Sequence, residues 1–194
     1  MRRAAARRIR ARGFTLVEMM VTVAIAAALV GLGAPSLRSL LARHAVANEA
    51  GAMLDAVRLA RSEAMKRGGP VILCKTNPLA ASACSTDARV GWQTWLVYAD
   101  ANRSGAYEAG EPVVRAQPTV PARVLVTADA RLASVRFEST GIVLASSAPD
   151  GVVFVLSPVS GAGAAETGER AARRQLCLNS RGDAVVVDGA GACP

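Results

Sequence analysis

An almost unbroken apolar run extends from residue 14 to residue 34, and Glu18 is the only charged side chain within it. As an α-helix rising about 1.5 Å per residue, this run would be roughly 31 Å long, which matches the hydrocarbon core of a bilayer. Six arginines and no acidic residue precede Phe14, and basic flanks hold the N-terminus of a membrane helix in the cytoplasm. We therefore predict a single-pass membrane helix over 14–35, with the rest of the chain outside the cytoplasm.

Beyond this run the apolar positions form a stripe, mostly at steps of three, four or seven residues, which is the spacing of one face of an amphipathic helix. The stripe comprises Leu37, Leu40, Leu41, Ala47, Ala50, Leu54, Val57 and Ala64. The basic pair Lys66 and Arg67, followed by Gly-Gly-Pro, marks the end of the helix, because cations favour the last turn and glycine and proline interrupt the helical backbone. The sequence predicts that the helix continues over 36–69.

From residue 71 onward, short runs rich in Val, Leu and Ile alternate with Gly, Pro, Ser and Asp, a pattern typical of antiparallel strands and turns. We expect strands near 71–75, 90–98, 112–116, 123–128, 134–138, 142–145, 151–157, 174–179 and 184–188. The Gly/Ala-rich stretch 160–174 is predicted to be a mobile loop. The expected fold class is α+β, with a long N-terminal helix whose outer half packs on an antiparallel β-rich globular domain at 70–194.

The junction between the basic leader and the apolar run carries a resemblance. Its sequence, GFTLVE from Gly13 to Glu18, resembles the processing site of type IV pilins and type II secretion pseudopilins. The resemblance implies that a prepilin peptidase removes residues 1–13, cutting after Gly13, and methylates the new amine of Phe14. It also implies that Glu18 pairs with the N-terminal amine of a neighbouring subunit. The alternative is an ordinary signal anchor in which Glu18 is accidental.

A second resemblance lies in "GWQTWLVYADANRSGAYEAGEPVVR", residues 91–115, which is similar to the GspH/FimT group of minor pseudopilins and pilins. It implies a pilin-like fold, assembly with other pilin-type subunits through the N-terminal helix, and a periplasmic domain anchored in the inner membrane. The function expected is a minor pseudopilin of type II secretion, with a minor pilin of a type IV pilus as the alternative. Of Trp92 and Trp95, three residues apart on an expected strand, we assign one to the core. The other either packs on the sheet or forms an exposed contact.

The loop that follows these tryptophans contains oxygen-bearing side chains at the spacing of an EF-hand-like calcium loop. The candidate ligands are Asp100, Asn102, Ser104, Glu108 and Glu111, with Gly105 at the turn. Because the flanking segments read as strands and not helices, the alternative is a hairpin loop with solvated acids. Calcium is the only cofactor that the sequence suggests.

The four cysteines all follow the predicted membrane segment, where an oxidising compartment permits disulfides. Three pairings are possible, and we prefer the local one, Cys74 with Cys84 and Cys177 with Cys193. Zinc is disfavoured, because no tight Cys pair or His ligand accompanies these residues. His44, the only histidine, lies among polar neighbours and is expected at the surface.

Charge and motif content argue against catalysis and against nucleic acid as a partner. The formal net charge of +8 falls to +2 without the six leader arginines, and the sequence shows no Ser/His/Asp set, phosphate-binding glycine loop or paired catalytic carboxylates. A membrane-anchored periplasmic enzyme is therefore the weaker hypothesis. DNA-binding members of the resembled group are expected to carry a Gly-Arg motif near the C-terminus, where this chain has Asp183 after the glycine. The arginines that remain nearby are Arg170, Arg173, Arg174 and Arg181.

Overall fold

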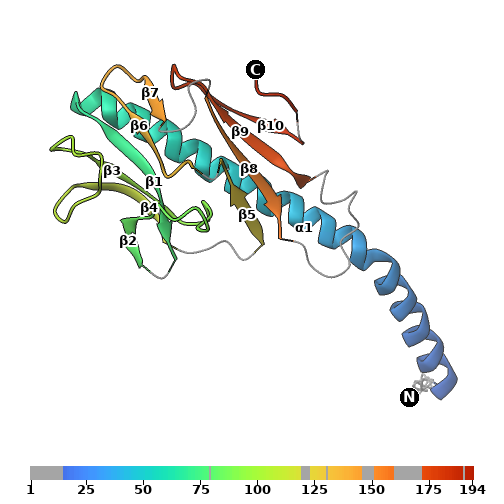
Figure 1. Ribbon diagram of the computed structural model, residues 1–194. Helices are drawn as coiled ribbons and strands as arrows, with labels where there is room; N and C mark the ends of the chain where they lie inside the picture. The colour runs from blue at the N-terminus through green and yellow to red at the C-terminus, as the bar shows by residue number, and fades with distance from the viewer. Residues whose placement is uncertain are drawn as a thin grey trace, which may run out of the picture. The chain divides into compact units, whose positions relative to one another are not determined.

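The computed structural model of the chain describes residues 15–78, 80–118, 123–129, 131–145, 151–159, 172–189 and 191–194. Its single long helix among these residues is α1 (Leu16–Arg67), and strands follow it (Figure 1). The strands are β1 (Val71–Asn77), β2 (Ala80–Cys84), β3 (Trp95–Ala99), β4 (Val113–Gln117), β5 (Val124–Thr127), β6 (Ser134–Phe137), β7 (Val143–Ala145), β8 (Val152–Pro158), β9 (Arg174–Leu178) and β10 (Ala184–Asp188). The chain divides into two compact units, of which the first ends at Leu37 and the second comprises Arg38–Pro194.

The strands of the second unit form two antiparallel sheets. One has the order β4-β3-β1-β6-β7, with β2 paired to β1, and the other has the order β10-β9-β8-β5. Among the described residues, backbone hydrogen bonds link the two sheets through their loops: the Trp92 N–H, before β3, donates to the Val126 oxygen on β5 at 3.0 Å, and the Val143 N–H on β7 donates to the Ser180 oxygen in the β9–β10 turn at 2.9 Å. The α+β class that the sequence predicted is therefore confirmed.

Within the second unit, α1 buries one apolar stripe against the inner faces of both sheets. Its fully buried members include, at alternating steps of four and three residues, Val46, Ala50, Met53, Val57, Ala60 and Ala64, and Ala56 is buried beside them. Of the predicted stripe, Ala50, Val57 and Ala64 are buried. Leu40 and Leu41, in contrast, are 49% and 46% exposed. The reason is that the core contacts of the helix begin only at Ala45, so leucines before this point have no sheet to cover them.

The helix ends where the sequence predicted. The Gly69 N–H donates to the Ala64 oxygen at 3.3 Å, and Gly68 has a φ of 64°. This is the geometry of a Schellman motif, in which a left-handed residue terminates the helix and its successor bonds back to the last turn. Glycine fits this position because it has no Cβ to strain the left-handed backbone.

Two expectations about the strands were wrong. β2 was not predicted, because its sequence AASAC has little β-propensity; it pairs with β1 and ends at the disulfide-bonded Cys84. Residues 90–94 are not a strand, and β3 begins only at Trp95. Since Trp92 precedes the strand, the alternation rule does not apply to it. Both tryptophans are buried in the same core, Trp92 against Phe154 with ring centroids 4.9 Å apart.

Both disulfides have the local pairing that the sequence favoured. Cys74 is bonded to Cys84, and Cys177 to Cys193, each with Cα atoms 5.6 Å apart. The first ties β2 to β1, and the second holds the C-terminal residues against the central strand β9. His44 is exposed, as expected.

Glu49 is a charged side chain in the core, and its replacement by glutamine is expected to stabilise the protein. Its carboxylate accepts a hydrogen bond from Gln117 on β4, and burial raises the pKa of Glu49 despite this bond. Because the pKa of Glu49 is higher in the folded than in the unfolded protein, its protonated form favours folding. Its contribution to the free energy of unfolding is therefore complete below the unfolded-state pKa and is lost as the pH rises through the folded-state pKa. Glu49→Gln should therefore raise the free energy of unfolding by about 1 kcal/mol at neutral pH and have little effect at pH 4.

Urea denaturation at the two pH values measures this change. Asp55→Asn is the matched control, because Asp55 is exposed on the same helix. A destabilised Glu49→Gln protein at neutral pH would contradict the argument.

Candidate functional site

The N-terminal end of α1 has a well-defined helix cap. Thr15 precedes the first helical residue, and its Oγ1 accepts a hydrogen bond from the Glu18 N–H at 3.3 Å. A threonine followed three residues later by glutamate is the capping-box pattern, and a carboxylate in the first turn also favours the helix dipole. This role of Thr15 was not predicted from the sequence, although the T-x-x-E spacing signals it. The cap therefore fixes the backbone of Glu18 in the first turn.

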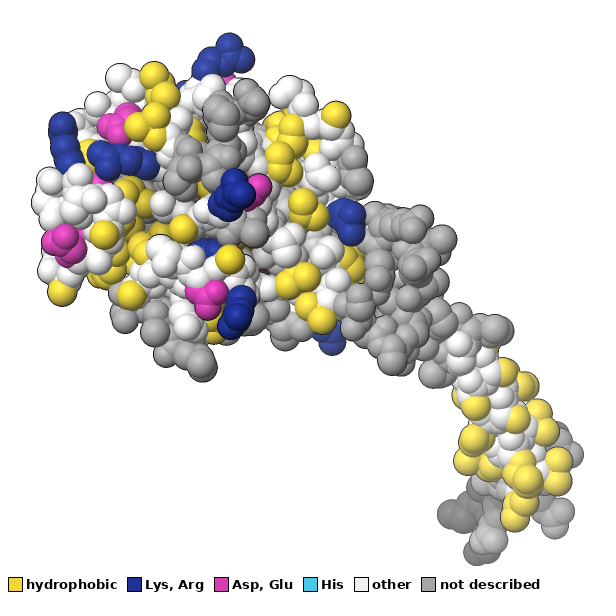
Figure 2. Space-filling view, in the orientation of Figure 1, with side chains coloured by type: hydrophobic (Ala, Val, Ile, Leu, Met, Phe, Trp, Pro, Cys, Tyr) yellow, Lys and Arg dark blue, Asp and Glu magenta, His cyan; other side chains and the backbone are white. Residues whose placement is uncertain are grey.

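Large apolar side chains are exposed along the first unit. Exposed fractions reach 76% for Leu16, 65% for Met20 and 66% for Leu29. Figure 2 shows apolar side chains over much of this helical segment. A shallow apolar groove on it is lined by Leu16, Met19, Met20, Val23, Ala24 and Ala27. Such a contiguous apolar surface marks a site that a partner or a lipid phase covers.

Glu18 lies in the same exposed helical segment, although it is not among the residues that line the groove. Its side chain is exposed, and among the described residues it forms no ion pair. Gly13 and Phe14, the predicted processing junction, lie outside the described residues. The pairing of Glu18 with a neighbouring subunit's amine stays a prediction.

Among the residues that the structure describes, no helix combines the length and the apolar character needed to cross a membrane.

The 100–111 loop is organised by hydrogen bonds to its own acidic side chains. Asp100 is 1% exposed, and its Oδ2 accepts bonds from the Gly105 N–H at 3.1 Å and from Arg136 Nη1 at 3.2 Å. Glu111 accepts the backbone N–H groups of Ala101 at 3.2 Å and of Glu108 at 2.9 Å. The loop is thus closed on itself, and Arg136 of β6 supplies a cation to its first carboxylate.

The remaining polar side chains of the loop also bond to one another. Asn102 Nδ2 donates to Glu108 Oε2 at 2.9 Å, and Asn102 Oδ1 accepts the Ser104 N–H at 3.0 Å. Ser104 Oγ donates to the Ala106 oxygen at 3.1 Å. These bonds tie the polar side chains of the loop to one another.

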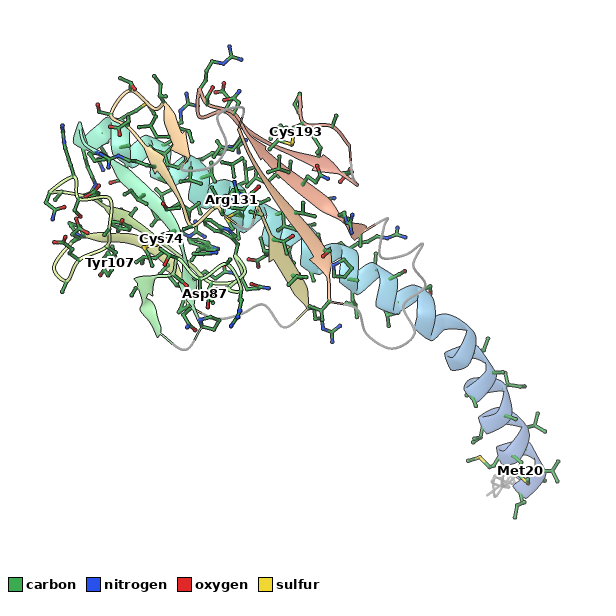
Figure 3. The ribbon with its side chains drawn as sticks, viewed as in Figure 1. Met20, Cys74, Asp87, Tyr107, Arg131 and Cys193 are labelled. Atoms are coloured by element: carbon green, nitrogen blue, oxygen red, sulfur yellow. A yellow bond between two sulfur atoms is a disulfide. The ribbon has the colours of Figure 1, made fainter. Side chains whose placement is uncertain are left out.

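The loop covers a second, smaller apolar cluster on the outer face of the first sheet. This cluster contains Ile72, Cys74, Leu96 and Tyr98, with Cys84 and Tyr107 packed against it. The rings of Tyr98 and Tyr107 meet edge to face with centroids 5.1 Å apart. Tyr107 and Cys74 are both labelled in Figure 3. The loop therefore has a packing role, because Tyr107 closes the outer face of β3 and β1.

Calcium binding by the loop stays a prediction of the sequence. Within the described ranges, no group of three or more His, Cys, Asp or Glu side chains is placed to hold a metal ion. Asp100 Oδ1 is buried without a hydrogen-bond partner, so this oxygen is available to coordinate a calcium ion. Because calcium would have to disrupt the Arg136 pair and the bonds at Glu111, we expect affinity no tighter than about millimolar, the weak end of protein calcium sites.

Calorimetry on the full chain in detergent, with Asp100→Ala as the control, measures this affinity. Heat that saturates in the millimolar range and disappears in the variant is the expected result. No heat at millimolar calcium would show that the loop is only a hydrogen-bonded turn.

The C-terminal arginines are partly occupied by ion pairs. Arg174 Nε lies 3.2 Å from Asp188 Oδ1. Arg61 of α1 donates to the Gly182 oxygen and to Asp183 Oδ1, both at 2.9 Å, and this bond lowers the pKa of Asp183. Asp183 therefore ties the β9–β10 turn to the helix. Arg170 lies outside the described residues, and weak or absent DNA binding stays a prediction.

Comparison with known proteins agrees with the two resemblances in the sequence. A family model described as type II transport protein GspH matches residues 49–191, and the prokaryotic N-terminal methylation motif matches residues 8–34. No curated protein matches the chain.

Two crystal structures of the type IV minor pilin FimU from Pseudomonas aeruginosa PAO1 are similar to this chain. Each is 15% identical to it and covers 74% of it; the matches span 91% and 87% of the FimU chains, with TM-scores of 0.45 and 0.46.

The two family models together cover the leader junction, Glu18 and nearly all of the domain that packs on α1. Because the larger match alone spans more than half of the sequence, the chain belongs to the family of type II transport protein GspH.

Proposed function

We propose that this protein is a minor pseudopilin, a structural subunit of the type II secretion pseudopilus that takes part in protein export across the outer membrane. The observation that carries the proposal is the GspH family match over residues 49–191, joined to an N-terminal methylation motif over residues 8–34. The role is structural and requires no enzymatic activity.

Processing and membrane insertion come first in the proposed sequence of events. A prepilin peptidase removes residues 1–13 and methylates the amine of Phe14. The apolar segment 14–35 then anchors the subunit in the inner membrane, with residues 36–69 and the β-rich domain at 70–194 in the periplasm. The arginines of the leader support this orientation.

Assembly with other pilin-type subunits follows through the N-terminal helix. The exposed side chains of Leu16, Met20 and Leu29 give the helix an apolar surface that neighbouring helices can cover. In a lipid phase, packing and polar pairing drive helix association, because lipid and side chains are similarly apolar. Glu18 contributes the polar pairing, since an unpaired carboxylate in the bilayer is costly until a cation approaches it.

A deletion strain tests the proposed function. Loss of the gene should leave an exported protein in the periplasm while pili assemble normally, and the intact gene on a plasmid should restore export. Normal secretion together with a defect in pili would contradict the proposal and favour the alternative, a minor pilin of a type IV pilus.

A further inference from the structure

The part of α1 that precedes the core combines exposed leucines with a cation and no acid. The sequence contains no acidic residue between Glu18 and Glu49. Leu40, Leu41 and Arg43 are exposed, and among the described residues Arg43 forms no ion pair. This stretch of the helix is therefore apolar and positively charged, and it has no carboxylate to offset the charge.

One end of the four-stranded sheet carries the same combination of side chains. Arg123 precedes β5, and Val159, which follows β8, donates its N–H to the Arg123 oxygen at 2.9 Å. Arg173 precedes β9, and the register of β8 with β5 and β9 puts it at the same end. Both arginines are exposed and, within the described ranges, form no ion pair. Val159 is 53% exposed, and Asp188 at this end is paired with Arg174.

Strand and helix lengths bring this end of the sheet level with the exposed part of α1. At the other end of the sheet, Arg61 of α1 is bonded to the β9–β10 turn. Asn179, where this turn begins, is six residues from Arg173, which is roughly 20 Å of strand. An equal length of helix is about 13 residues and leads from Arg61 to residue 48, little more than one turn from Arg43. Figure 1 shows β8 and β9 running along α1 over this length.

We call the exposed side chains of these two places the basic collar: Leu40, Leu41, Arg43, Arg123, Val159 and Arg173. Leu40 is five residues beyond residue 35, the end of the proposed membrane segment, and α1 is continuous across this interval. Five helical residues rise about 8 Å, and the polar layer on each side of the hydrocarbon core is roughly 5 to 8 Å thick. The first residues of the collar therefore reach the lipid headgroups, a step that rests on the membrane anchor of the proposed function.

We propose that the basic collar docks on the anionic phospholipid headgroups of the membrane in which the subunit is anchored. Arg43, Arg123 and Arg173 bind phosphate oxygens, because a guanidinium donates two parallel hydrogen bonds to a phosphate. The leucine and valine side chains of the collar enter the interface, where apolar burial and attraction to anionic lipid add together. Every copy docks in the same orientation relative to the bilayer, in agreement with one membrane topology for all subunits.

A lipid surface fits the collar better than a nucleic acid does. Nucleic-acid affinity comes chiefly from phosphate contacts, which would leave the apolar members of the collar in water. A bilayer covers the cations and the apolar side chains together. The anchor also holds the collar beside the headgroups, so that docking is an intramolecular event at high effective concentration.

Fluorescence quenching of the full chain in vesicles tests the docking. A fluorophore on Val159→Cys, with both native disulfides intact, should be quenched by lipids that carry a nitroxide on the headgroup. The quenching should be stronger in vesicles that contain phosphatidylglycerol than in vesicles of phosphatidylcholine alone. Ile142→Cys is the matched control, since Ile142 is 48% exposed and its neighbour Val143 is bonded to the β9–β10 turn at the other end of the sheet. Equal quenching of Val159→Cys in the two kinds of vesicle would overturn the proposal.

A pair of charge variants provides the second measurement. Arg123→Gln together with Arg173→Gln should lower the equilibrium constant for docking by roughly thirtyfold, which corresponds to about 1 kcal/mol for each arginine near an anionic surface. Arg103→Gln together with Arg181→Gln removes the same formal charge from exposed positions in the 100–111 loop and the β9–β10 turn, and should leave docking unchanged. Equal losses in the two double variants would show that net charge acts without the collar, and would overturn the proposal.

Flotation of the same samples separates this proposal from the proposed function. An anchored chain floats with both kinds of vesicle. A chain that floats but shows no quenching dependent on phosphatidylglycerol would overturn the docking alone, whereas a chain that floats with neither kind would overturn both. Binding of a DNA duplex through Arg123 and Arg173, without lipid-dependent quenching, would assign the collar to nucleic acid and overturn the docking.

Discussion

Replacing Glu18 with alanine is expected to lower incorporation of the subunit into filaments by roughly ten- to a hundredfold, the effect of about 1.4 to 2.8 kcal/mol. The carboxylate belongs to an exposed helical segment, in the first turn of α1. In a bilayer such a group carries a penalty of roughly 2.5 kcal/mol or more until a cation pairs with it. Alanine removes this penalty, so the isolated subunit in the bilayer becomes more stable. It also removes the ion pair that stabilises the subunit in the filament, so both changes disfavour incorporation.

The measurement is the fraction of subunit that co-purifies with sheared filaments at native expression levels. Thr22→Ala is the matched control, because Thr22 lies one turn further along and its hydroxyl donates to the Met19 oxygen of its own helix at 2.9 Å. Incorporation of Glu18→Ala at the level of wild type would contradict the pairing argument. Unfolding of the β-rich domain should be the same in both variants, because the core contacts of the described helix begin only at Ala45.

Replacing Gly182 with alanine is expected to destabilise the globular domain by about 2 to 4 kcal/mol. Gly182 has a φ of 84°, and a left-handed backbone costs an alanine roughly 1 kcal/mol or more. An added Cβ would also overlap the backbone oxygen of Gly141 and lie 3.0 Å from Arg61 Nε. Because the first neighbour is backbone, two turns would have to separate, and the bonds from Arg61 to Gly182 and Asp183 would be disturbed.

Gly68→Ala is the matched control for this prediction. Gly68 has a similar φ of 64°, but an added Cβ would meet no atom within 4 Å. The difference between the two variants therefore isolates the cost of the overlap. Denaturation followed by the fluorescence of the buried Trp92 and Trp95 reports on this core, and equal losses in the two variants would show that packing of the turns is unimportant.

Much of the fold could be predicted because its signals are local. The end of α1 follows from a basic pair and two glycines, and both disulfides join cysteines only 10 and 16 residues apart. The features that were missed depend on contacts between distant segments. β2 is a strand of alanine and serine stabilised by its pairing with β1. Arg61 and Gly182 are 121 residues apart, so no local pattern connects them.

The candidate sites were likewise predictable where their signals are local and unpredictable where they depend on distant segments. Glu18 was identified from a motif that includes its immediate neighbours, and the cap formed by Thr15 belongs to that motif. The calcium pattern was also read from local spacing, but Arg136, which pairs with Asp100, comes from β6, 36 residues further along. A spacing rule counts the acidic side chains in a loop, whereas the charge that neutralises them comes from elsewhere in the fold.

Intact-mass analysis of the protein extracted from membranes tests the central claim most directly. The account predicts a mature chain that begins at Phe14 and carries one methyl group on its amine, with both disulfides formed. A chain that keeps residues 1–13, or one that begins within or after residues 19–34, would contradict it.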